Sequence, residues 1–90
     1  MKILKFNAIW CSGCIVTKKI MKEIEELYPN IKIESYDYDM DEDIVKKWNI
    51  GEIIPVLIFL DEQENEIGRL IGEKTKKEII KEIDRLNEKN

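Results

Sequence analysis

The sequence predicts a single α/β domain over residues 1–90, with a four-stranded mixed sheet and three helices distributed over both faces of that sheet. Ninety residues, 43% of them hydrophobic, are enough for one compact core. The spacing of the hydrophobic residues switches between strand and helix periods in the order β-α-β-α-β-β-α. A β-α-β unit has a right-handed crossover, so its two strands are parallel, and the later hairpin adds antiparallel strands.

The first β-α unit is predicted from a change of hydrophobic period. Residues 2–6 form a short strand that runs into a turn. From about residue 11 to residue 28 the period becomes helical, and Pro29 ends the helix. The expected buried stripe of this helix consists of Val16, Ile20, Ile24 and Leu27.

A second strand and a short helix come next. Residues 31–36 alternate apolar and polar side chains, as a strand does. Either Asp39 or Asp41 can cap the short helix, whose charges suit the helix dipole. The apolar face of this helix consists of Ile44, Val45 and Trp48.

The last third of the chain reads as a hairpin followed by a helix. Residues 56–60 are apolar on both faces, which is typical of a buried central strand, and residues 66–71 form its hairpin partner. Thr75 and Glu78 form a capping box at the start of the last helix. The inward side chains of that helix are Ile79, Ile80, Ile83 and Leu86.

Composition and charge exclude several classes of partner. The chain has 15 basic and 19 acidic residues and no basic cluster interleaved with aromatic residues, so no nucleic acid partner is expected. The longest apolar run, residues 56–60, is far too short to cross a bilayer, and no helix has a predominantly basic polar face, so no membrane association is expected. The N-terminus lacks the long apolar segment of a signal peptide, which predicts a cytoplasmic protein.

The two cysteines of the chain lie three positions apart in the segment Trp10-Cys11-Ser12-Gly13-Cys14. A structural zinc site needs four ligands, usually Cys and His, whereas the chain has two Cys and no His. A permanent disulfide is disfavoured because the cytosol keeps thiols reduced and because so short a loop constrains the unfolded chain little. Two buried, inert cysteines are the remaining alternative to redox chemistry.

The position of the two thiols favours reversible redox chemistry. Cys11 falls at the predicted helix N-terminus, where unpaired backbone N–H groups and the helix dipole stabilise a thiolate. Cys14 lies one turn further along on the same face, within disulfide distance of Cys11. One sulfur can attack a disulfide and the other can release the mixed disulfide that results. A CxxC pair beside a β-α-β pattern is a thioredoxin-like signature.

Four motifs, in the right order and spanning nearly the whole chain, resemble those of thioredoxins. The segment from Ala8 to Cys14 looks like the family's Ala-x-Trp-Cys-Gly-Pro-Cys active site. Residues 36–39 look like the apolar-Asp-apolar-Asp stretch that ends the family's second strand. Ile54-Pro55 looks like the family's cis-proline loop, and Gly72 matches the glycine at the edge of its substrate groove. The resemblance therefore implies the thioredoxin fold.

The resemblance also assigns roles to residues. It implies that Cys11 is the attacking thiolate and that Cys14 is the resolving thiol. The Ile54–Pro55 peptide bond is expected to be cis and to face Cys11, while the backbone of Ile54 pairs with a substrate peptide. The residues implied to form the substrate groove are Trp10, Ile54, Pro55 and Gly72.

The activity implied is that of a thioredoxin-like protein-disulfide oxidoreductase, which carries electrons in cell redox homeostasis as a monomer and binds no cofactor. Its expected partners are protein disulfide substrates and an electron donor of the thioredoxin-reductase kind, an NADPH-dependent flavoprotein. Three alternatives stay open. They are a glutaredoxin-like reductase that uses glutathione, a non-catalytic thioredoxin-fold binding module, and a carrier of copper(I) or zinc.

Lys5 is the most unusual residue when set against the family pattern. It stands six residues before Cys11, where many thioredoxins have a buried Asp. One interpretation is a lysine whose stem is buried while its ammonium reaches solvent. The other is a pKa-tuning ammonium close to a cysteine sulfur, which favours the thiolate and makes the redox couple more oxidising.

Overall fold

The computed structural model describes residues 1–88 and has the element order that the sequence predicts. The strands are β1 (Lys2–Asn7), β2 (Lys32–Asp37), β3 (Val56–Leu60) and β4 (Glu66–Ile71). The helices are α1 (Ser12–Leu27), α2 (Glu42–Lys47) and α3 (Lys76–Glu88). Among these residues no helix has the length and apolar character needed to cross a bilayer.

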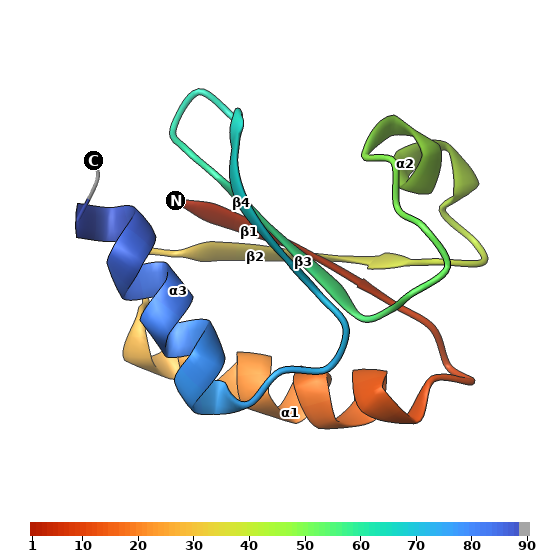
Figure 1. Cartoon of the computed structure of the whole chain (residues 1–90), viewed down its shortest axis with the longest axis horizontal. Helices are drawn as coiled ribbons and strands as arrows, with labels where there is room; N and C mark the ends of the chain where they lie inside the picture. The colour runs from red at the N-terminus through yellow and green to blue at the C-terminus, as the bar shows by residue number, and fades with distance from the viewer. Residues whose placement is uncertain (89–90) are drawn as a thin grey trace.

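The four strands form one mixed sheet in the order β2-β1-β3-β4. β1 and β2 are parallel, whereas β3 is antiparallel to both of its neighbours. In Figure 1, α1 and α3 lie together on one side of the sheet and α2 lies on the other. The predicted architecture, a mixed four-stranded sheet with helices on both faces, is confirmed.

Each face of the sheet carries its own hydrophobic cluster. The cluster toward α1 and α3 consists of Ile3, Met21, Ile24, Ile31, Leu57, Phe59, Ile79, Ile83 and Leu86. The cluster toward α2 consists of Leu4, Phe6, Ile50, Val56, Ile58 and Leu60, with Ile44, Val45 and Trp48 packed against it. Because successive side chains of a strand point to opposite faces, β3 is buried along its whole length, as its apolar run predicts.

The buried stripe of α1 is not the one that the hydrophobic spacing predicts. Val16 is 47% exposed and Leu27 is 57% exposed, and Ile24 is the one residue of the predicted stripe that is buried. The observed stripe consists of Cys14, Thr17, Met21 and Ile24. Thr17 can be buried because its hydroxyl donates a hydrogen bond to the carbonyl oxygen of Gly13 at 2.9 Å. This phase turns Cys14 toward the sheet.

The two central strands fix the place of the cysteines. Phe6 near the end of β1 pairs with Val56 at the start of β3, so the turn after β1 and the loop before β3 meet at one end of the sheet. In the turn after β1, the N–H of Cys11 donates to the carbonyl oxygen of Ala8 at 3.2 Å. Figure 1 shows the first turn of α1 and the start of β3 at this end.

Candidate active site

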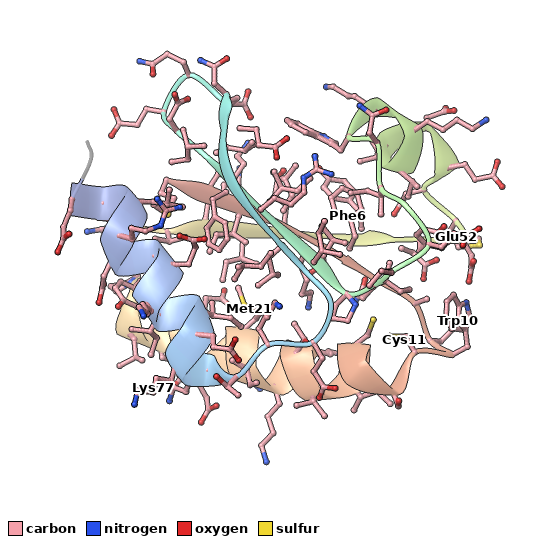
Figure 2. All side chains as sticks on the ribbon, in the orientation of Figure 1. Phe6, Trp10, Cys11, Met21, Glu52 and Lys77 are labelled. Carbon is pink, nitrogen blue, oxygen red and sulfur yellow. The ribbon has the colours of Figure 1, made fainter. Side chains whose placement is uncertain are left out.

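Cys11 is the N-cap residue of α1. Its backbone is extended, with φ −94° and ψ 111°, and its sulfur accepts a hydrogen bond from the backbone N–H of Cys14 at 3.3 Å. Cap side chains normally satisfy one of the unpaired N–H groups at a helix start through oxygen, and here a sulfur does so. Figure 2 shows Cys11 at this first turn with Trp10 beside it. The sulfur therefore lies at the positive end of the helix dipole, as the sequence predicts.

The loop before β3 lies against the Cys11 sulfur. The Cys11 thiol donates to the carbonyl oxygen of Ile54 at 3.7 Å, and the Ile54–Pro55 peptide bond is cis. The carbonyl oxygen of Pro55 accepts from the N–H of Gly72 at 2.8 Å. Gly72 has φ +90°, a conformation that a residue with a Cβ rarely adopts. These contacts bring together three places that lie far apart in the sequence, namely Cys11, the Ile54–Pro55 pair and Gly72.

Cys14 is the deeper of the two thiols. Its residue is 3% exposed, against 9% for Cys11, and both cysteines are free. Cys14 packs with Ala8, Cys11, Tyr38 and Ile54 in a small cluster beneath the helix start. Burial, followed by the hydrogen bond with Cys11, raises the pKa of Cys14 to about 11. Cys14 is therefore a thiol at neutral pH.

Trp10 forms one exposed side of the site. Its residue is 62% exposed, and the indole N–H donates to a carboxylate oxygen of Asp39 at 2.7 Å. The ring of Tyr38 meets the indole edge-on, with 6.4 Å between ring centroids. Asp39 and Tyr38 belong to the stretch that resembles the end of the family's second strand, but the sequence assigned neither of them to the site.

Of the two residues that the sequence offered as caps for α2, Asp39 and Asp41, the structure has Asp41 as the N-cap residue.

Exposed apolar side chains lie on the two segments that meet at the Cys11 sulfur. Ile9 precedes Trp10 and is 90% exposed, and Ile53 precedes Ile54 and is 62% exposed. A methyl group of Ile53 is 3.7 Å from where a Cβ on Gly72 would lie, which brings Ile53 close to Gly72. A Cβ on Gly13 would lie 3.5 Å from the Glu73 carboxylate, so the site carries the Glu73 charge as well as that of Asp39. Single exposed apolar residues are ordinary on a surface, whereas groups of them mark contact sites.

Lys5 lies on β1 beneath the helix, opposite Ser35 of β2 and Leu57 of β3. It is buried, although a lysine is rarely so without a partner. Burial is the main cause that lowers its pKa, with a further contribution from Lys18. The nearby Cys14 and Glu25 act in the opposite direction. Within residues 1–88 no group of three Cys, Asp or Glu side chains is placed to hold a metal ion.

Comparison with known proteins gives one consistent result. A protein-family model described as thioredoxin matches residues 1–84. Thioredoxin H5 of Oryza sativa subsp. japonica is 34% identical over 70 residues, which is 78% of this chain and 50% of that protein. Thioredoxin H4-1 of the same organism is 30% identical over 81 residues, which is 90% of this chain and 60% of that protein. The chain thus spans about half to three fifths of the length of these curated relatives.

Solved structures agree on the fold. Thioredoxin 1 of Thermosipho africanus is 28% identical and superposes with a TM-score of 0.85, covering 98% of this chain and 96% of that one. Thioredoxin-2, described as a component of the malaria parasite protein secretion machinery, superposes with a TM-score of 0.86 at 22% identity. This superposition covers 93% of this chain and 81% of the thioredoxin-2 chain.

Proposed function

This chain belongs to the thioredoxin family, and from that premise we propose that it is a thiol–disulfide oxidoreductase that reduces disulfide bonds in other proteins. The observation that carries the proposal is the unequal placement of the two thiols. The sulfur of Cys11 accepts a hydrogen bond from a backbone N–H at a helix start and follows the exposed Trp10, whereas Cys14 is more deeply buried. This difference supports a role for Cys11 in meeting the substrate and for Cys14 in releasing it.

The reaction has two steps. In the first, the Cys11 thiolate attacks one sulfur of the substrate disulfide, a Cys11–substrate disulfide forms, and the other substrate sulfur leaves as a thiolate. In the second, the Cys14 thiolate attacks the sulfur of Cys11, the Cys11–substrate bond breaks, and the second substrate sulfur leaves as a thiolate. Two electrons pass to the substrate, and the protein ends with a Cys11–Cys14 disulfide.

The surroundings of Cys11 support the first step. The N–H of Cys14 already donates to the Cys11 sulfur, and a hydrogen bond to an ionised acceptor is about twice as strong as one between neutral groups. The positive end of the α1 dipole adds to this stabilisation of the thiolate. Both effects act on the sulfur that we propose to be the nucleophile.

The substrate peptide is proposed to lie in the groove formed by Trp10, Ile54, Pro55 and Gly72. Two contacts support this: the Cys11 thiol donates to the carbonyl oxygen of Ile54, and the N–H of Gly72 donates to the carbonyl oxygen of Pro55. The exposed indole of Trp10 offers a flat apolar surface to a partner. In this proposal the protein acts as a cytoplasmic monomer without a bound cofactor, and a thioredoxin-reductase-like flavoprotein returns it to the dithiol state.

Turnover of a protein disulfide tests the proposal. The purified protein, with dithiothreitol as the electron donor, should reduce the disulfides of insulin many times per molecule. Cys11→Ser should abolish this turnover, and Cys14→Ser should accumulate a covalent Cys11–insulin disulfide. A single stoichiometric adduct with the natural protein would instead indicate a binding module. Faster labelling of Cys14 than of Cys11 by iodoacetamide near pH 7 would reverse the two roles.

A further inference from the structure

Lys5 is the one charged residue that is buried within residues 1–88, with 6% of its surface exposed. Its ammonium makes no hydrogen bond or ion pair to any residue in the described part of the chain. No side-chain nitrogen in that part is both fully buried and without a hydrogen bond, so the ammonium must reach solvent. The ammonium is nevertheless partly desolvated and has no partner, which costs free energy.

Lys5 and Cys14 line two neighbouring cavities. The first, of about 340 Å³, is lined by Lys5, Lys18, Lys22, Glu25 and Ser35 among others. The second, of about 240 Å³, is lined by Cys14, Lys18, Ala8 and Asp37 among others. Lys18 lines both, so the two cavities are neighbours along α1. Cys11 faces the loop before β3, whereas Cys14 lines the second cavity, on the β2 side of the helix.

Charges around the two groups show how they interact. Burial, followed by the hydrogen bond with Cys11, raises the pKa of Cys14, whereas a backbone hydrogen bond at Ala8 and, to a smaller extent, Lys5 lower it. In return, Cys14 raises the pKa of Lys5, against the effects of burial and Lys18. Glu25 is the other acidic group that acts on Lys5, and Asp37 lines the cavity at Cys14. The ammonium of Lys5 and a thiolate at Cys14 therefore stabilise each other.

We propose that Lys5 is a positioning residue for the second step of the reaction, in which its ammonium stabilises the Cys14 thiolate as that thiolate forms. The inference rests on the proposed function and deepens it. The proton of Cys14 passes to water in the cavity on the β2 side of α1, away from the substrate groove. The Cys14 thiolate, held by the nearby positive charge, then attacks the Cys11 sulfur of the mixed disulfide. The Cys11–substrate bond breaks, and the electron pair leaves on the substrate sulfur.

Dithiodipyridine separates the two steps because it is uncharged and each cleavage releases a coloured thiopyridone. The first phase of release reports attack by Cys11, and the second reports attack by Cys14 on the mixed disulfide. We expect Lys5→Met to leave the first phase unchanged and to slow the second severalfold at pH 7, because a smaller fraction of Cys14 is then ionised. The pH profile of the second phase should move to higher pH.

Matched variants separate electrostatics from packing. Lys5→Arg should keep a fast second phase because it keeps the positive charge, whereas Lys5→Gln should behave like Lys5→Met. Lys22→Met removes a charge from the cavity that Lys5 lines, but Lys22 does not line the cavity at Cys14, so both phases should stay unchanged. A second readout needs no turnover: in Cys11→Ser, thiolate absorbance should show that Lys5→Met raises the pKa of Cys14.

The outcomes are distinct. A second phase that is equally fast in Lys5→Met and in the natural protein overturns the role of Lys5. Equal slowing of both phases also overturns it, because that pattern indicates a change in structure. Failure of the natural protein to show a first phase would overturn the proposed function itself, whereas the absorbance titration would still test the Lys5–Cys14 interaction.

Discussion

The indole N–H of Trp10 donates to the carboxylate of Asp39 at 2.7 Å, which ties the residue before the first cysteine to the segment after β2. The bond holds an exposed ring in one orientation, with Tyr38 against its edge. A ring fixed in this way loses little conformational entropy when a partner binds to it. The pair therefore gives the proposed substrate groove a rigid wall.

Trp10→Phe should weaken substrate binding more than it weakens the fold. Phenylalanine cannot donate to Asp39, so we expect KM for insulin to rise severalfold, while the free energy of unfolding falls by at most about 1 kcal/mol because the site is exposed. Asp39→Ala should shift KM in the same direction. Trp48→Phe, which alters a ring packed on the α2 side of the sheet, should lower stability and leave KM unchanged. An unchanged KM in Trp10→Phe would exclude Trp10 from the groove.

Gly72→Ala should destabilise the protein through its backbone. A Cβ at this position would meet nothing closer than 3.7 Å, so steric overlap is absent, but φ +90° is unfavourable for alanine. We expect the free energy of unfolding in urea to fall by about 1–2 kcal/mol. Gly51→Ala is the matched control, because nothing lies within 4 Å of its Cβ position. Its stability should be unchanged or up to about 1 kcal/mol higher. Equal losses in the two variants would contradict this explanation.

Alkaline pH should destabilise the reduced protein more than the oxidised protein. The pKa of Cys14 is raised from 9.0 to about 11, so between these values the unfolded reduced chain releases a proton that the folded chain keeps. Unfolding is then favoured as pH rises, by an amount on the order of 2 kcal/mol across the window.

The Cys11–Cys14 disulfide serves as the control for this pH effect because it cannot titrate. Tyr28 and Tyr36 also have raised pKa values, but they affect both redox forms alike and cancel in the difference. Urea unfolding of both forms from pH 8 to pH 11 measures the difference between their free energies of unfolding. A constant difference between the two forms would show that burial does not hold the Cys14 proton.

Thr75→Ala should lower stability without affecting activity. The Thr75 hydroxyl accepts from the N–H of Glu78 at 3.1 Å, and the Glu78 carboxylate accepts from the N–H of Thr75 at 3.0 Å. Loss of this reciprocal cap should cost about 1 kcal/mol in urea unfolding. Insulin turnover should stay at the level of the natural protein, since α3 begins outside the site. A loss of turnover without a loss of stability would show that this helix start contributes to function.

The sequence predicted the architecture well because each element has a clear spacing of hydrophobic residues or a residue that clearly begins or ends it. The run from residue 56 to residue 60 is one example, and the capping box at Thr75 is another. The buried stripe of α1 was predicted wrongly because the spacing of hydrophobic residues alone does not include Thr17. In the structure, its hydroxyl is satisfied within the helix, which makes Thr17 equivalent to an apolar residue.

The site was predictable only where residues adjoin in the sequence or match the family pattern. The hydrogen bond between Trp10 and Asp39 spans 29 positions, and no local period reports such a contact. Lys5 could be singled out as unusual, but which thiol it acts on depends on the phase of α1. Cys14 holds its proton at neutral pH. Lys5 is therefore proposed to affect the rate of the second step, whereas the sequence suggested an effect on the redox equilibrium.

In the proposed reaction the sulfur that caps α1 is also the atom that reacts, so the start of this helix would change with each turnover. A thiolate at Cys11 is a strong acceptor for the N–H of Cys14, whereas a disulfide sulfur is a weak one. Amide hydrogen exchange at Cys14 should therefore be slow in the reduced protein and faster in the oxidised protein, while exchange at the buried strand β3 stays the same. If the proposed reaction holds, the first turn of α1 reports the oxidation state of the protein, and a partner that contacts this turn can distinguish the reduced form from the oxidised form.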